Sequence, residues 1–98
     1  MASYRTTNLA DDDIVAAYVQ GVRDFGVEHA ERYHARLAAT FDLIARHPEM
    51  APERTAFEPP VRIHRHQAHH IIYLIDDEGV LIVRLLPRYR DWEALVFQ

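Results

Sequence analysis

Four histidines lie close together in the last third of this 98-residue chain: His64, His66, His69 and His70. Histidine ionises near neutral pH, so it can bind a metal ion, move a proton in catalysis or line a solvated surface. Alternate side chains of a strand share one face, which would place His64 and His66 together, with His70 joining from a neighbouring strand. The segment lacks the helical histidine pair and nearby acid that typify a metal centre, so we expect no metal site.

Arginines near these histidines would supply the second half of a ribonuclease site, because a guanidinium stabilises negative charge on a phosphate. If the chain cleaves RNA, the candidate catalytic residues are His64, His70, Arg84 and Arg88. If the histidines only line a solvated strand face, the chain has no catalytic residue. The residue types leave both interpretations open.

Other reactive motifs are missing from the sequence. Cysteine is absent, and the one serine, Ser3, stands near the N-terminus, so the usual nucleophiles are lacking. Gly21, Gly26 and Gly79 are too far apart to form a phosphate-binding loop or a dinucleotide fingerprint. We therefore expect no cofactor.

Two helical patterns precede the histidines. Apolar residues recur at helical spacing between Thr7 and Gly26, and again from Val27 to Pro48, which ends the second pattern. Thr7 or Asn8 can cap the first helix, and Gly26 can end it. So short a connection makes the two helices antiparallel neighbours in a hairpin.

The remaining segments have strand-like spacing. We expect four strands, at residues 4–7, 61–66, 70–75 and 80–86. Gly79 completes the turn between the last two, and the proline-rich segment 49–60 predicts an irregular connection. The order β-α-α-β-β-β predicts one α+β domain over residues 1–98, with the helical hairpin packed on one face of an antiparallel sheet.

The last two strands are apolar on both faces, whereas one helical hairpin can cover only one of them. The other face must therefore pack against the C-terminal tail or against another protein chain. The candidate partner-binding residues on these strands are Ile71, Ile72, Tyr73 and Leu74.

The C-terminal tail is rich in the residue types that dominate protein interfaces. These candidate target-binding residues are Arg88, Arg90, Trp92 and Phe97. The alternative for Trp92 is a packing role, in which it folds back and covers the exposed face of the sheet.

Composition narrows the class of partner. The net charge of −4 argues against a protein that binds bare nucleic acid, which usually has a basic surface. No apolar run approaches the length of a membrane span, and the first residues do not resemble a secretory signal, so we expect a cytoplasmic protein.

Short pieces spread over nearly the whole chain resemble the ParE toxins of the RelE/ParE superfamily, from bacterial type II toxin–antitoxin systems. The matching pieces are Tyr4-Arg5, Ala10, Asp13-Ile14, Phe25-Gly26-Val27, Ala30, Tyr33, Leu37, Ile44–Met50, Arg62, His70, Ile71, Tyr73, Val80–Leu86 and Arg90-Asp91. The chain departs from the family at Ala51, where glycine is frequent, and at Pro87, where histidine is common.

The resemblance implies a toxin that inhibits DNA gyrase without catalysis, a ParD-like antitoxin that wraps it, and contact with operator DNA only through that antitoxin. RelE-like relatives instead cleave mRNA on the ribosome with lysine, arginine and a C-terminal tyrosine or histidine. This chain has no lysine, and Val61 and Ile63 stand near the positions where those relatives have basic residues. Two alternatives stay open: a RelE-like ribonuclease, and a diverged member that only binds antitoxin.

Overall fold

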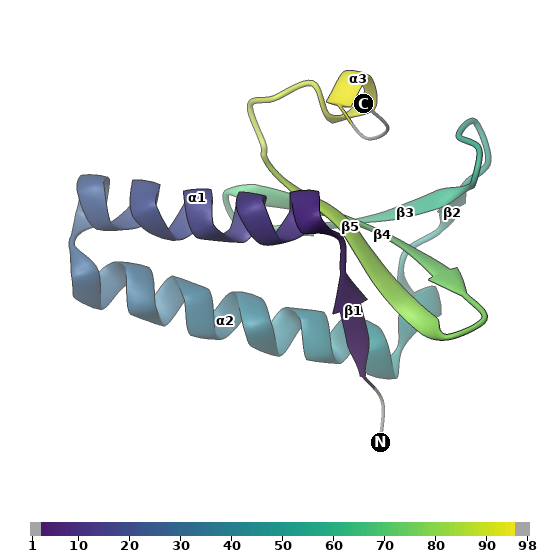
Figure 1. The fold of residues 1–98 in the computed structure, drawn as a ribbon, viewed down its shortest axis with the longest axis horizontal. Coiled ribbons are helices and arrows are strands. Elements are labelled where there is room, and N and C mark those ends of the chain that lie inside the picture. The colour runs from purple at the N-terminus through teal and green to yellow at the C-terminus, as the bar shows by residue number, and fades with distance from the viewer. Residues whose placement is uncertain (1–2, 96–98) are drawn as a thin grey trace.

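The computed structural model describes residues 3–95 and contains one sheet with a helical hairpin on one side (Figure 1). The elements are β1 (Tyr4–Thr6), α1 (Asn8–Phe25), α2 (Val27–Arg46), the 3-10 helix η1 (Pro48–Met50), β2 (Glu53–Arg54), β3 (Val61–His66), β4 (His69–Asp76), β5 (Gly79–Pro87) and the short helix α3 (Trp92–Leu95). None of the helices described here is long and apolar enough to cross a bilayer.

The strands lie side by side in the order β1-β5-β4-β3-β2. Neighbouring strands are antiparallel except that β1 pairs with β5 in parallel, so the sheet is mixed. The expected α+β fold is confirmed, together with the helical hairpin on one face. Along the chain, α1 and α2 stand between β1 and the other strands. Because the two helices are antiparallel, α2 ends beside the start of α1.

Local sequence signals set the limits of the two long helices. The Thr7 hydroxyl accepts a hydrogen bond from the backbone N–H of Ala10 at 3.0 Å, which caps the start of α1. Gly26 separates α1 from α2 with a φ of 89°, a conformation that favours glycine because it has no Cβ. Gly21 allows close helix packing, since a Cβ there would lie 3.4 Å from Cβ of Ala30.

The sheet separates two apolar clusters. We call the side that carries α1 and α2 the covered face and the other side the open face. The covered-face cluster includes Leu37, Phe41, Ile71, Tyr73, Ile82 and Leu85, all fully or almost fully buried. On the open face the buried residues are Val61, Ile72, Val83 and Leu86, with Phe57 and Trp92 packed against them.

Two segments differ from the sequence-based expectation. The connection over 49–60 was expected to be irregular, but it contains most of η1 and all of β2, whose two residues pair with Arg62 and Val61 of β3. The chain after β5 folds back over the open face and forms α3 (Figure 1). Both differences depend on contacts between distant segments, which local periodicity does not report.

Candidate functional site

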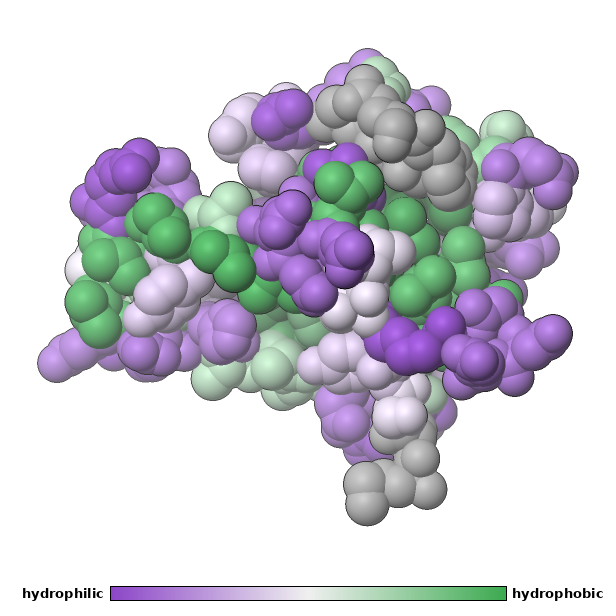
Figure 2. All heavy atoms as spheres, in the orientation of Figure 1, coloured by the Kyte–Doolittle hydropathy of each residue, from purple (hydrophilic) through white to green (hydrophobic). Residues whose placement is uncertain are grey.

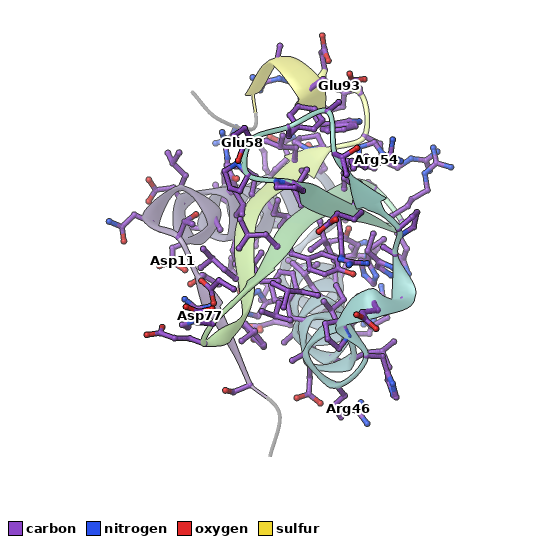
Figure 3. All side chains as sticks on the ribbon, turned by 90° about the vertical axis from the view of Figure 1, so that its right-hand side faces the viewer. Asp11, Arg46, Arg54, Glu58, Asp77 and Glu93 are labelled. Carbon is purple, nitrogen blue, oxygen red and sulfur yellow. The ribbon has the colours of Figure 1, made fainter. Side chains whose placement is uncertain are left out.

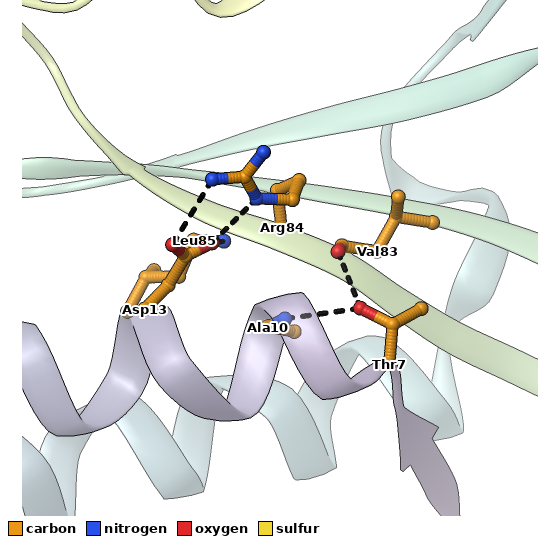
Figure 4. A network of polar contacts seen from close by, with 6 residues as sticks. All are labelled: Thr7, Ala10, Asp13, Val83, Arg84 and Leu85. Carbon is orange, nitrogen blue, oxygen red and sulfur yellow. Dashed lines mark hydrogen bonds and ion pairs between the residues drawn. The ribbon is translucent and has the colours of Figure 1, made fainter. Parts of the chain in front are cut away.

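Asp13 joins helix α1 to strand β5 where the two run side by side (Figure 4). Its carboxylate accepts hydrogen bonds from Nε and Nη2 of Arg84 at 2.8 and 3.1 Å, and from the backbone N–H of Leu85 at 3.0 Å. Both charged side chains are largely buried, with 16% and 13% of their surface exposed. The carboxylate raises the pKa of Arg84, so this predicted catalytic arginine is held in a structural ion pair.

Two of the four histidines lie against helix α2 on the covered face. The Tyr33 hydroxyl lies 2.6 Å from Nδ1 of His69, and the Thr40 hydroxyl lies 3.2 Å from Nδ1 of His66. Burial is the main cause that lowers the pKa of both histidines, and Asp13 partly opposes it at His69. These neutral imidazoles therefore connect the β3–β4 turn to α2.

Of the four residues of the predicted ribonuclease site, His70 and Arg88 lie near each other, and the other two lie elsewhere. His64 pairs with Ile71 and therefore lies on the covered face, while His70 pairs with Arg65 and lies on the open face. Arg84 is bonded to Asp13, and Arg88 follows β5 in an exposed turn. His64 and His70 are thus separated by the sheet, and His70 does not join His64 and His66 as expected.

The predicted partner-binding residues on β4 are divided between the two faces. Ile71 and Tyr73 belong to the covered-face cluster, and the Tyr73 hydroxyl donates a hydrogen bond to the carbonyl of Pro48 at 2.7 Å. Ile72 is buried on the open face, whereas Leu74 beside it is half-buried. Ile71, Ile72 and Tyr73 have no exposed surface in this conformation, so Leu74 is the one member of the set that a partner can touch directly.

The predicted target-binding residues lie in or after the turn that follows β5. Arg88 and Arg90 are exposed, and Trp92 is half-buried on the open face, where its ring centroid lies 5.4 Å from that of Phe57. Phe97 lies outside the described residues. Trp92 therefore has the packing role that the sequence left as an alternative, and it keeps part of its surface exposed.

A cavity of about 430 Å³ runs along the helical hairpin to the end of β5. Its lining is mainly apolar and includes the polar side chains of Asp13, Tyr33 and Arg84. Tyr89 and Arg90 border it from the turn after β5. A mainly apolar groove with a few polar groups suits side chains of a partner peptide.

Sequence reasoning missed Tyr89, although it is the most exposed of the large apolar residues described, with 85% of its surface accessible. The available signal was a large aromatic residue between Arg88 and Arg90, just after the proline that ends the last strand. Figure 2 shows further apolar surface over α1 and over the sheet near β4 and β5, where Leu74 and Leu81 are half-buried.

Comparisons with known proteins found a matching family and similar solved structures. A family model described as the ParE toxin of a type II toxin–antitoxin system, parDE, matches residues 4–92. A solved structure described as the chromosomal ParDE TA system from P. aeruginosa aligns with a TM-score of 0.75, covering 89% of this chain and 96% of that chain at 19% sequence identity. At that identity the alignment establishes a common fold. No curated protein sequence matches the chain.

Proposed function

Because the chain belongs to the ParE toxin family of type II toxin–antitoxin systems, we propose that it blocks DNA replication by binding DNA gyrase, and that a ParD-like antitoxin neutralises it. A cytoplasmic location follows from that target. The proposal describes a binding protein whose effect on gyrase needs no bond to be made or broken by its own side chains.

The observation that carries the binding mechanism is the dispersal of the candidate catalytic residues. His64 and His70 lie on opposite faces of the sheet, and Arg84 is engaged by Asp13. General acid–base catalysis requires the reacting groups within hydrogen-bond reach of one substrate. This arrangement favours inhibition by contact over RNA cleavage by these residues.

The turn after β5 is the part of the surface best suited to contact gyrase. Arg88, Tyr89 and Arg90 are all exposed there. Tyrosine and arginine frequently provide most of the binding energy at protein interfaces, and here they lie next to a groove. Trp92 supports the same segment from the open face.

The groove and the half-exposed apolar residues on the open face offer surface for an antitoxin. The groove provides about 430 Å³ between the helical hairpin and the end of β5, and Leu74 and Leu81 extend the apolar surface on the other side of the sheet. An antitoxin segment that wraps the toxin would cover both regions.

Two assays with the purified chain test the target. We expect inhibition of gyrase supercoiling and no cleavage of mRNA on ribosomes. Tyr89→Ala and Arg90→Ala should each weaken inhibition at least tenfold, the loss typical of an interface residue that contributes strongly to binding. The matched control is Arg32→Ala, an exposed arginine on α2 outside the groove lining.

The opposite pattern of activities would contradict the proposal. Cleavage of mRNA without an effect on gyrase would establish the RelE-like alternative. Equal inhibition by Arg90→Ala, Tyr89→Ala and the Arg32→Ala control would remove the turn after β5 from the gyrase contact.

A further inference from the structure

The open face gathers four basic side chains from four separate segments of the chain. Arg65 on β3 pairs with His70 on β4, and the backbone N–H of Arg88 donates to the carbonyl of Ala68 in the turn between these strands. Arg54 of β2 lies over the Trp92 ring, with 5.5 Å from its Cζ to the ring centroid. We call Arg54, Arg65, His70 and Arg88 the arginine cluster.

The arginine cluster has no acidic partner among residues 3–95. No carboxylate oxygen there lies within 4.0 Å of a guanidinium nitrogen of Arg54, Arg65 or Arg88. By contrast, Arg84 contacts Asp13, and Arg5 contacts Asp76 and Glu78. The positive charges of the three arginines also lower the pKa of His70, after the larger effect of burial.

The cluster concentrates positive charge on one face of a chain whose net charge is −4. Repulsion among like charges destabilises the folded chain, and a negatively charged partner would relieve it. Nδ1 of His70 is buried and has no hydrogen-bond partner within residues 3–95, so one polar atom of the cluster is left without a contact there.

The surroundings of the cluster indicate which kind of anion fits. Ile63, Leu74 and Leu81 are half-buried on the same face, so apolar surface continues from the positive charges along the sheet. The Trp92 ring already contacts Phe57 and Arg54, so a nucleic-acid base would have to compete with both for stacking on it. A peptide that alternates acidic and apolar side chains matches this face better than a nucleic acid.

We infer that the open face binds an extended antitoxin segment whose acidic side chains contact Arg54, Arg65 and Arg88 and whose apolar side chains cover Leu74 and Leu81. The inference rests on the proposed function, since it specifies the chemistry of the antitoxin. A segment bound in this way also covers Arg88 at the start of the turn assigned to gyrase, so it neutralises the toxin by occupying part of the same surface. Figure 3 shows Arg54 at the outer edge of the sheet, toward Glu93 of α3 and away from Arg46 of α2.

Charge reversal tests the inference with the ParD-like antitoxin of the proposed function. Its affinity for the toxin is measured by calorimetry for the wild type, Arg54→Glu, Arg65→Glu and the double variant. We expect each single reversal to weaken binding about fivefold and the double reversal about thirtyfold, as for exposed ion pairs that become repulsive. Arg32→Glu, a charge reversal on the exposed side of α2, is the matched control and should change affinity less than about twofold.

The salt dependence of antitoxin binding provides a second measurement, and its wild-type arm needs no variant. Raising NaCl from about 0.1 M to about 0.5 M should weaken antitoxin binding to the wild type more than to the double variant, because salt screens exposed charges. Arg54→Glu and Arg65→Glu should still inhibit gyrase when no antitoxin is present, since neither belongs to the turn assigned to gyrase.

The outcomes separate the inference from the proposed function. If the wild type binds the antitoxin and both reversals bind equally well, the inference is wrong and the proposed function stands. If the wild type binds no antitoxin, both are wrong. If a single-stranded RNA binds the wild type and the double reversal abolishes that binding without changing antitoxin affinity, the cluster is a nucleic-acid site. Concentration-dependent dimerisation that the double reversal abolishes would instead assign the face to a second copy of the chain.

Discussion

Two regions of the sheet use arginine in opposite ways. Beside helix α1 the Arg84 guanidinium is bonded to Asp13 and is largely shielded from solvent. Farther across the open face Arg54 and Arg65 are exposed and have no carboxylate partner among residues 3–95. The Asp13–Arg84 pair therefore specifies how α1 docks on the sheet, whereas the second region keeps its charges available to a partner.

The apolar residues differ between the two faces of the sheet. The covered face is closed by two helices and buries large side chains such as Leu37, Phe41 and Tyr73 almost completely. The open face is closed only in part, by Phe57 and by Trp92 at the start of α3. Mutations should accordingly affect stability most on the covered face and binding most on the open face.

The largest expected effect comes from the covered-face core. Phe41→Ala should lower the free energy of unfolding by about 3–5 kcal/mol, because it leaves a cavity between α2 and the sheet. The ring also makes an edge-to-face contact with Tyr4 of β1, with centroids 5.4 Å apart. Urea unfolding measures the effect, and Leu43→Ala on the same helix, at a position 37% exposed, is the control. Equal losses from the two variants would contradict this division of the core.

Loss of the ion pair between Asp13 and Arg84 should have the next largest effect on the free energy of unfolding. Asp13→Ala should cost about 3 kcal/mol, because it removes a buried carboxylate that binds both Arg84 and the backbone of β5. Asp12→Ala, an exposed aspartate one residue earlier, is the control. If thermal unfolding gives the same stability for both variants, Asp13 does not hold α1 to the sheet.

Much of the covered face could be predicted from sequence because its signals are local. Thr7, Gly26 and Pro48 mark the helix ends, and the apolar spacing between them gives the docking side of each helix. The order of elements then leaves few ways to pack a helical hairpin on a sheet. The structure confirms the resulting α+β fold.

The open face could not be predicted in the same way. In the run Ile71–Leu74 every side chain is apolar, so spacing alone does not say which residues face the helices. Strand register determines it, and register also separates His64 from His70. The pairing of β2 with β3 joins residues on the two sides of a proline-rich connection, which no local pattern encodes.

Trp92→Ala tests whether the open face contributes stability or only binding. Because the side chain is half-buried against Phe57 and the open-face cluster, we expect a loss of about 1–2 kcal/mol, or about 5–10 °C in melting temperature. Tyr89→Ala is the control, since an 85% exposed ring should leave the melting temperature unchanged while weakening gyrase inhibition. An unchanged melting temperature for Trp92→Ala would show that the ring does not cover the sheet.

The smallest expected effect is a loss of stability in acid, to which both faces contribute. Burial lowers the pKa of His69 on the covered face and of His70 on the open face below the ordinary value of 6.5. At a pH just below 6.5 the unfolded chain therefore binds more protons at these two histidines than the folded chain does. The neutral forms of the two histidines leave the stability of the folded chain undiminished above pH 6.5. The free energy of unfolding then decreases as the pH falls through 6.5 toward the folded pKa values.

The two histidines should differ in how salt changes this acid effect. Three nearby positive charges add to the effect of burial at His70, whereas Asp13 opposes it at His69. Salt of about 0.5 M screens exposed charges, so it should reduce the loss in melting temperature between about pH 7.5 and pH 5.5 in the wild type. The reduction should persist in His69→Gln and disappear in His70→Gln, because only His70 lies among exposed arginines. If both variants respond to salt as the wild type does, the charges of the arginine cluster do not act on His70.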